Sequence, residues 1–143
     1  MDPISFGVTL AAAMELYEIG AINNTDTNGL ELKFGSAKSL VTAAELTGIG
    51  EGFGIDLGLG SKLLCKKYNR ADLAMVSKGQ EFPGYDGRSM QGMALAYATS
   101  NRGACHLRAD PYGDDFDGGP ITGKAKIVYE SQNSTAAVDS SAQ

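Results

Sequence analysis

The sequence is poor in the residues that crosslink a chain, bind zinc or anchor a protein in a membrane. Its 143 residues include two cysteines and one histidine, too few for a disulfide scaffold or a zinc cluster. No apolar run approaches the roughly 20 residues of a membrane-spanning helix, and we expect no secretory signal, because no basic segment precedes an apolar one. Cys65 and Cys105 form no C-x-x-C pair, so we expect buried, reduced thiols in a cytoplasmic protein.

Positive charge is also scarce. The chain has 12 basic and 17 acidic residues, which gives a net charge of -5. An acidic surface repels phosphate groups, so we expect neither nucleic acid nor an anionic membrane as a partner. The content of 43% hydrophobic and 20% charged residues is typical of a globular domain large enough to bury a core.

Helix signals dominate the chain. Asp2 and Pro3 predict a helix start, with an N-cap followed by proline in the first turn, and Gly20 predicts the end of that helix. This helix is apolar nearly all round, so we expect neighbours on all sides. Further helices are expected at 36–47, 55–68 (buried through Ile55, Leu59 and Leu63), 89–101 and 121–138, with a short strand at 30–34 and an acidic loop at 109–120. These elements predict a mainly α fold, a compact multi-helix unit with long loops.

Two stretches that could bind phosphate or calcium lack the required spacing. Residues 48–60 contain six glycines, but none completes a G-x-G-x-x-G or P-loop pattern. The acidic residues of 109–120 lack the spacing and the final glutamate of an EF-hand. We therefore predict no metal ligands in this chain.

The densest group of chemically useful side chains lies between residues 84 and 108. It contains Tyr85 and the only histidine, His106, which together are a plausible acid and base near neutral pH. Arg102 and Arg108 flank the histidine and could either bind an anion or brace the loop. A single histidine is more often structural than catalytic, so the residue types alone leave both interpretations open.

The same region carries a family resemblance. The segment 77–88 and the run Ala-Leu-Ala-Tyr-Ala-Thr-Ser-Asn-Arg-Gly-Ala-Cys-His-Leu-Arg at 94–108 resemble the aldehyde:ferredoxin oxidoreductase family, as does the block at 2–7. The resemblance spans the whole chain and implies an interior fragment of a larger, mostly helical enzyme. Residues 1–76 would be the end of its second domain and 77–143 the start of its third. Gly87 departs from the family pattern, in which proline is common.

The resemblance implies an activity and its cofactors. The family oxidises aldehydes to carboxylic acids, with ferredoxin as the electron acceptor. It uses tungsten or molybdenum on two pterins beside a 4Fe-4S cluster. Asp2 and Asp139 match acidic positions of the two pterin-binding motifs, but Ala142 and Gln143 stand where the second motif has glycine and leucine. We expect the isolated fragment to be inactive and to bind no cofactor, and a homo-oligomer is left open.

By the same matching, Tyr85 and His106 fall on positions that line the family's substrate pocket, which gives them an expected catalytic role. Two alternatives stay open at this point. One is a non-catalytic helical scaffold or interaction module. The other is a member of the same family with a different substrate, such as an aromatic acyl-CoA.

Overall fold

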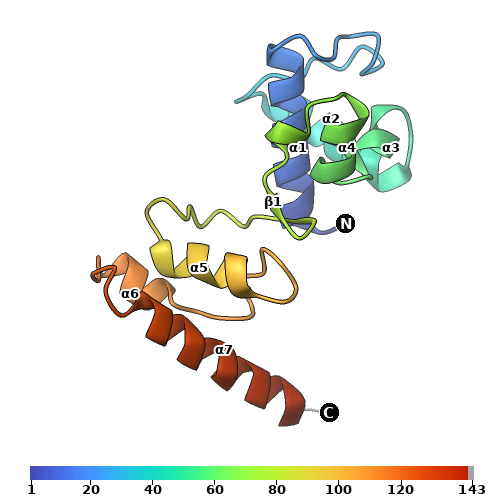
Figure 1. The fold of residues 1–143 in the computed structure, drawn as a ribbon. Coiled ribbons are helices and arrows are strands. Elements are labelled where there is room, and N and C mark those ends of the chain that lie inside the picture. The colour runs from blue at the N-terminus through green and yellow to red at the C-terminus, as the bar shows by residue number, and fades with distance from the viewer. Residues whose placement is uncertain (142–143) are drawn as a thin grey trace. The chain divides into compact units, whose positions relative to one another are not determined.

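The computed structural model describes residues 1–141 of the chain, which divides into two compact units, Met1–Val76 (unit 1) and Ser77–Gln143 (unit 2). The elements of unit 1 are α1 (Pro3–Glu18), α2 (Ala37–Ile49), α3 (Phe53–Leu57), α4 (Ser61–Lys67) and the 3-10 turn η1 (Ala71–Leu73). Those of unit 2 are α5 (Gln91–Thr99), α6 (Tyr112–Phe116) and α7 (Lys124–Ser141), as Figure 1 shows. The mainly α prediction is confirmed. The assignment of residues 1–76 and 77–143 to the second and third family domains stays a prediction.

The first helix begins and ends where the sequence predicts. The Asp2 carboxylate accepts hydrogen bonds from the backbone N–H groups of Ile4 and Ser5, each at 3.2 Å. Pro3 occupies the first helical position, where its missing N–H has no consequence. At the other end, Gly20 adopts a φ of +73°, which is the left-handed conformation that commonly follows a helix.

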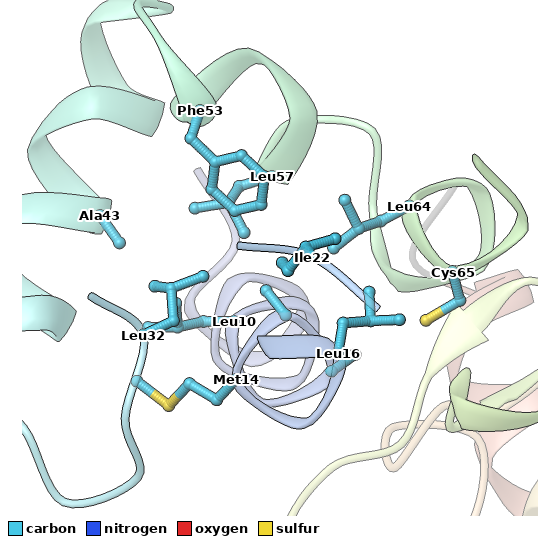
Figure 2. Close-up of a cluster of buried hydrophobic side chains, with 12 residues drawn as sticks. Leu10, Met14, Leu16, Ile22, Leu32, Ala43, Phe53, Leu57, Leu64 and Cys65 are labelled. Atoms are coloured by element: carbon cyan, nitrogen blue, oxygen red, sulfur yellow. The ribbon is translucent and has the colours of Figure 1, made fainter. Parts of the chain in front are cut away.

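The core of unit 1 is built around α1. Figure 2 shows Leu10, Met14 and Leu16 of this helix surrounded by side chains from other segments. The surrounding side chains come from the loop after α1 and from α2, α3 and α4: Ile22, Leu32, Ala43, Phe53, Leu57, Leu64 and Cys65. α1 thus packs against α2, α3 and α4, but the expectation of neighbours on all sides is only partly met, since Pro3, Gly7 and Glu18 are exposed.

The short strand predicted at 30–34 is wrong, because these residues form no strand. Leu32 is buried, as a strand residue would be. The backbone carbonyl groups of Leu30 and Glu31, however, accept hydrogen bonds from side chains and not from another strand. Thr27 Oγ1 donates to the carbonyl of Leu30 at 2.7 Å, and Ser39 Oγ donates to the carbonyl of Glu31 at 2.5 Å.

The long helix predicted at 55–68 is also wrong. The structure has the two short helices α3 and α4, separated by a turn in which Gly60 has a φ of +80°. The predicted buried stripe is on the surface, since Ile55, Leu59 and Leu63 are 60%, 43% and 52% exposed. Separately, α2 ends at Ile49, two residues later than predicted, and its C-cap residue Gly50 has a φ of +71°.

In unit 2, α5 packs against both α6 and α7 (Figure 1). The predicted helix at 89–101 corresponds to α5, but Ser89 does not cap it, since its hydroxyl donates to the carbonyl of Asp86 at 3.1 Å. The predicted acidic loop at 109–120 contains the five-residue helix α6. A hairpin of β1 (Val76–Ser77) and β2 (Gln80–Glu81) turns at Lys78 and Gly79, both with positive φ, as in a type I′ turn.

Candidate functional site

The structure brings the two predicted catalytic residues together. The rings of Tyr85 and His106 lie with their centroids 6.2 Å apart and their planes at 42°. Both side chains are half-buried, so each is held by packing and still reaches the surface of unit 2. A tyrosine hydroxyl can donate a hydrogen bond, and a neutral imidazole can accept a proton. The arrangement therefore combines a donor and a base in one place, and the catalytic role remains a prediction.

Tyr85 belongs to a compact aromatic cluster in unit 2. Its ring stacks on Tyr112 at 5.6 Å and 14°, and Phe82 packs edge-on against Tyr97 at 5.3 Å and 63°. The buried members of this aromatic cluster are Met90, Met93, Tyr97 and Ala104, and the partly buried ones are Phe82, Tyr85 and Tyr112. Met90 at the N-cap of α5 and Met93 and Tyr97 within the helix are thus core, with Tyr85 at the edge of the cluster.

Local hydrogen bonds fix the segment that carries Tyr85. Asp86 accepts from the backbone N–H of Arg88 at 2.9 Å and from its guanidinium at 2.5–3.0 Å. These bonds lower the pKa of the Asp86 carboxyl to about 2. The next residue, Gly87, lies against α5 so closely that a Cβ there would be 2.7 Å from Cβ of Ala94. The glycine that replaces the family's proline therefore suits this close approach.

The segment before His106 is tied to the β1–β2 hairpin. Lys78 Nζ donates to the carbonyl of Ser100 at 2.6 Å, and Ser77 Oγ donates to the carbonyl of Tyr97 at 3.1 Å. Gly103 has a φ of +104°, and a Cβ at this position would lie 2.2 Å from the carbonyl oxygen of Ser77. Only glycine fits this contact, which places the turn that leads to His106.

Tyr97 carries a buried hydroxyl without a hydrogen-bond partner among the residues that the structure describes. The residue is 2% exposed. Burial, followed by the nearby Tyr85 and Cys105, raises the pKa of Tyr97 to about 12. An orphaned phenol inside an aromatic cluster is costly, because it loses its bonds to water and gains none.

We predict that Tyr97→Phe stabilises the chain by about 1 kcal/mol, because it removes an unpaired polar group from the core. Since the folded pKa of Tyr97, about 12, lies above the ordinary value of 10.0, stability should fall as the pH rises between these values. This fall should be smaller in the variant, and the part that remains comes from other groups such as Cys65, whose pKa is also raised. Urea unfolding at pH 8 and pH 11 measures both effects.

Tyr17→Phe is the control, because it removes a hydroxyl that donates to Asn24 Oδ1 at 2.5 Å, and it should be neutral or destabilising. A Tyr97→Phe chain less stable than the parent would contradict the prediction.

The two predicted cofactor-binding carboxylates lie in different units. Asp2 in unit 1 is exposed, and the bonds from Ser5 that help to cap α1 lower its pKa. Asp139 in unit 2 lies on α7 and is bound by the guanidinium of Arg108. A carboxylate accepts up to about four hydrogen bonds, so both residues keep acceptor capacity for the N–H groups of a pterin. These two acceptors thus suit the N–H groups of such a ring. Ala142 and Gln143 of the second motif lie outside the described residues.

Only one of the two flanking arginines, Arg108, has an ion pair in the described part of the chain. Arg108 braces the loop to α7 through Asp139. Its Nε atom is buried without a partner among residues 1–141, beside a hollow of about 300 Å³ lined by Thr99, Ser100, Asn101, Arg108, Gln132, Asn133 and Ala136. Arg102 is exposed. The structure thus favours the bracing role for Arg108 and assigns Arg102 no ion pair within the described part of the chain.

Sequence reasoning missed Tyr112 and the acidic residue Asp115 behind it. Tyr112 contacts Tyr85, and Asp115 caps α5 from 22–23 residues away along the chain. Both were assigned to an irregular acidic loop. No local pattern reveals such contacts, since each depends on a partner distant in sequence.

Cys65 and Cys105 are both buried free thiols, as predicted. Burial, and then the charge of Asp72, raises the pKa of Cys65. Among residues 1–141, no three His, Cys, Asp or Glu side chains gather in a way that could hold a metal ion. None of the described helices has the length and apolar character needed to cross a membrane.

Comparison with known proteins agrees with the resemblance in the sequence. The family model described as "Aldehyde ferredoxin oxidoreductase, domains 2 & 3" matches residues 1–143. The chain is 38% identical over 150 residues to the tungsten-containing aldehyde ferredoxin oxidoreductase of Pyrococcus horikoshii, 37% identical over 150 residues to that of Pyrococcus abyssi, and 36% identical over 149 residues to that of Pyrococcus furiosus.

These matches cover 97–98% of this chain and 25% of each relative. The chain thus spans about a quarter of the length of the relatives it matches. A family model that covers the entire chain leads to one conclusion. The chain belongs to the aldehyde ferredoxin oxidoreductase family.

Proposed function

We propose that the protein containing this chain oxidises aldehydes to carboxylic acids and passes the electrons to ferredoxin. Each turnover converts an aldehyde and water into a carboxylic acid, two protons and two electrons. The observation that carries the proposal is the proximity of Tyr85 and His106, whose ring centroids are 6.2 Å apart, in a chain that belongs to this family. The names of the relatives, tungsten-containing aldehyde ferredoxin oxidoreductases, support the substrate class and the acceptor.

In this proposal, Tyr85 and His106 have distinct roles in one pocket. The Tyr85 hydroxyl donates a hydrogen bond to the carbonyl oxygen of the aldehyde, which polarises the carbonyl and orients it. The imidazole of His106 accepts a proton as water adds and the acid forms. The aromatic cluster supplies an apolar wall beside Tyr85, and polar contacts are stronger in a medium of low dielectric constant than in water.

The proposed cofactors are a tungsten ion on two pterins and a 4Fe-4S cluster. When bound, these groups would supply two-electron redox chemistry at the metal and one-electron transfer to ferredoxin at the cluster. Asp2 and Asp139 would accept hydrogen bonds from the N–H groups of the two pterins. We assign neither buried cysteine to the cluster. The cytoplasm is the proposed location, as a compartment that keeps such thiols reduced.

The intact enzyme, purified anaerobically from cells supplied with tungstate, tests this function. We expect aldehyde-dependent reduction of ferredoxin, formation of the corresponding carboxylic acid in a ratio of one acid to two electrons, and tungsten in the purified protein. Reduction of an aromatic acyl-CoA without any oxidation of aldehydes would contradict the proposed substrate. An intact protein that lacks both tungsten and molybdenum would contradict the proposed chemistry.

A further inference from the structure

The short helix α6 contacts the catalytic segment through Tyr112. The Tyr112 ring lies nearly parallel to that of Tyr85, at 14° and 5.6 Å. Stacked aromatic rings restrict each other's rotation, because turning one ring drives its edge into the face of the other. Tyr112 thus limits the orientations that Tyr85 can adopt, and with them the direction of its hydroxyl.

The same helix holds the start of α5. The carboxylate of Asp115 accepts hydrogen bonds from the backbone N–H groups of Gly92 at 3.0 Å and Met93 at 2.9 Å. These donors have no partner within their own helix, because they belong to its first turn. The N-cap residue Met90 makes no side-chain cap bond. An aspartate from α6 therefore replaces the cap that the local sequence lacks.

A buried lysine neutralises this carboxylate. Lys124, at the start of α7, has a side chain only 6% exposed, and its ammonium bonds Asp114 and, at 2.6 Å, Asp115, whose own side chain is 1% exposed. Burial alone would raise the pKa of Asp115, but the bonds from Lys124, Gly92 and Met93 outweigh it, so this pKa lies below its ordinary value. The carboxylate is thus kept in the charged form that caps the helix.

The close fit of α6 on α5 depends on Gly92. A Cβ at this position would lie 2.9 Å from Cβ of Pro111 and 3.0 Å from the carboxylate oxygens of Asp115. The approach leaves no room for a larger side chain. Stacking at Tyr112, capping at Asp115 and the missing side chain at Gly92 therefore act together at one interface within unit 2.

We propose that α6 is a clasp that positions Tyr85, with Tyr112 and Asp115 as its positioning residues. Tyr112 sets the orientation of the Tyr85 ring, and Asp115 with Lys124 holds α6 on the start of α5. The consequence for catalysis rests on the proposed role of Tyr85 as the donor to the aldehyde oxygen. The positioning of the Tyr85 ring does not depend on that catalytic role, and it can be measured in a protein without activity.

The first test follows the Tyr85 ring by NMR in the 143-residue chain, with ring-labelled tyrosine and Tyr85→Phe to assign the signal. We expect Tyr112→Leu to remove the ring-current shift that the Tyr112 ring imposes on Tyr85, and Tyr112→Phe to keep this shift. Asp115→Asn should weaken the shift partly. Tyr129→Leu is the matched control, because Tyr129 is 67% exposed on α7. A Tyr85 signal that is unchanged in Tyr112→Leu overturns the proposal. If Tyr112→Leu does not fold, a changed Tyr85 signal in Asp115→Asn supports the clasp, and an unchanged one overturns it.

The second test uses the intact holoenzyme and a double-mutant cycle. If Tyr112 acts by aiming the Tyr85 hydroxyl, Tyr112→Leu lowers kcat about tenfold with little change in KM, and it has no further effect in a Tyr85→Phe background. An equal loss in both backgrounds indicates a general structural role and overturns the positioning proposal. If Tyr85→Phe itself keeps full activity, the proposed catalytic role of Tyr85 fails. The NMR result then still decides whether α6 positions the ring.

Discussion

Replacing His106 with glutamine is expected to lower kcat/KM for aldehyde oxidation in the intact enzyme by about 10²–10⁴-fold, the usual contribution of a general acid–base group. Glutamine has a similar size and keeps a hydrogen-bonding side chain, but it cannot carry a proton. His106 is the only histidine of the chain, and it lies beside Tyr85 at 6.2 Å. No other side chain at this contact can take over the proton transfer at neutral pH.

Steady-state kinetics with a small aldehyde and ferredoxin measure this effect. The loss should appear in kcat, because the proton moves during the reaction and not during binding. Lys126→Gln is the control, since its side chain is 79% exposed on α7, and it should stay within twofold of the parent enzyme. A His106→Gln enzyme with unchanged tungsten content and full kcat/KM would remove His106 from the mechanism.

Gly103→Ala is expected to destabilise unit 2 by about 2–5 kcal/mol. The left-handed φ of +104° at this glycine would cost about 1–2 kcal/mol for alanine. The new Cβ would also lie 2.2 Å from the carbonyl oxygen of Ser77, a backbone atom that cannot rotate away. Overpacking of this kind costs about 1–3 kcal/mol. The hairpin and the turn before His106 would have to separate.

Urea unfolding of the 143-residue chain, followed by circular dichroism, measures this loss. Gly84→Ala is the matched control in the same unit, because no atom lies within 4 Å of its Cβ position and its φ is not positive. We expect the control to change stability by less than about 0.5 kcal/mol, as for most surface substitutions. Equal unfolding midpoints for the two variants would show that the contact between Gly103 and Ser77 is not needed.

The parts of the fold that were predicted correctly depend on neighbouring residues. The first helix follows from Asp2, Pro3 and Gly20, whose effects act within one turn of the chain. The strand predicted at 30–34 failed because a strand needs a partner, and side chains bond its carbonyl groups instead. The helix predicted at 55–68 failed because its apolar period ignored the turn at Gly60.

The candidate site also combines residues that the sequence reveals with residues that only the fold reveals. Tyr85 and His106 were identified from the family resemblance, and their proximity, 21 positions apart in the chain, is a product of the fold. Tyr112 and Asp115 were not identified, because their partners lie more than 20 residues away. The cap of α5 is another example, since the distant Asp115 accepts the bonds from its first turn and the nearby Ser89 does not. Such long-range contacts cannot be read from local patterns.

The most direct test of the central claim is a crystal structure of the intact holoenzyme, with the metal located by its anomalous scattering. We expect the Tyr85 hydroxyl and the His106 imidazole to face the metal across a pocket large enough for a small aldehyde, with Tyr112 stacked behind Tyr85. A metal centre remote from this pair, or side chains of Tyr85 and His106 that point away from it, would contradict the assignment of this chain to the active site.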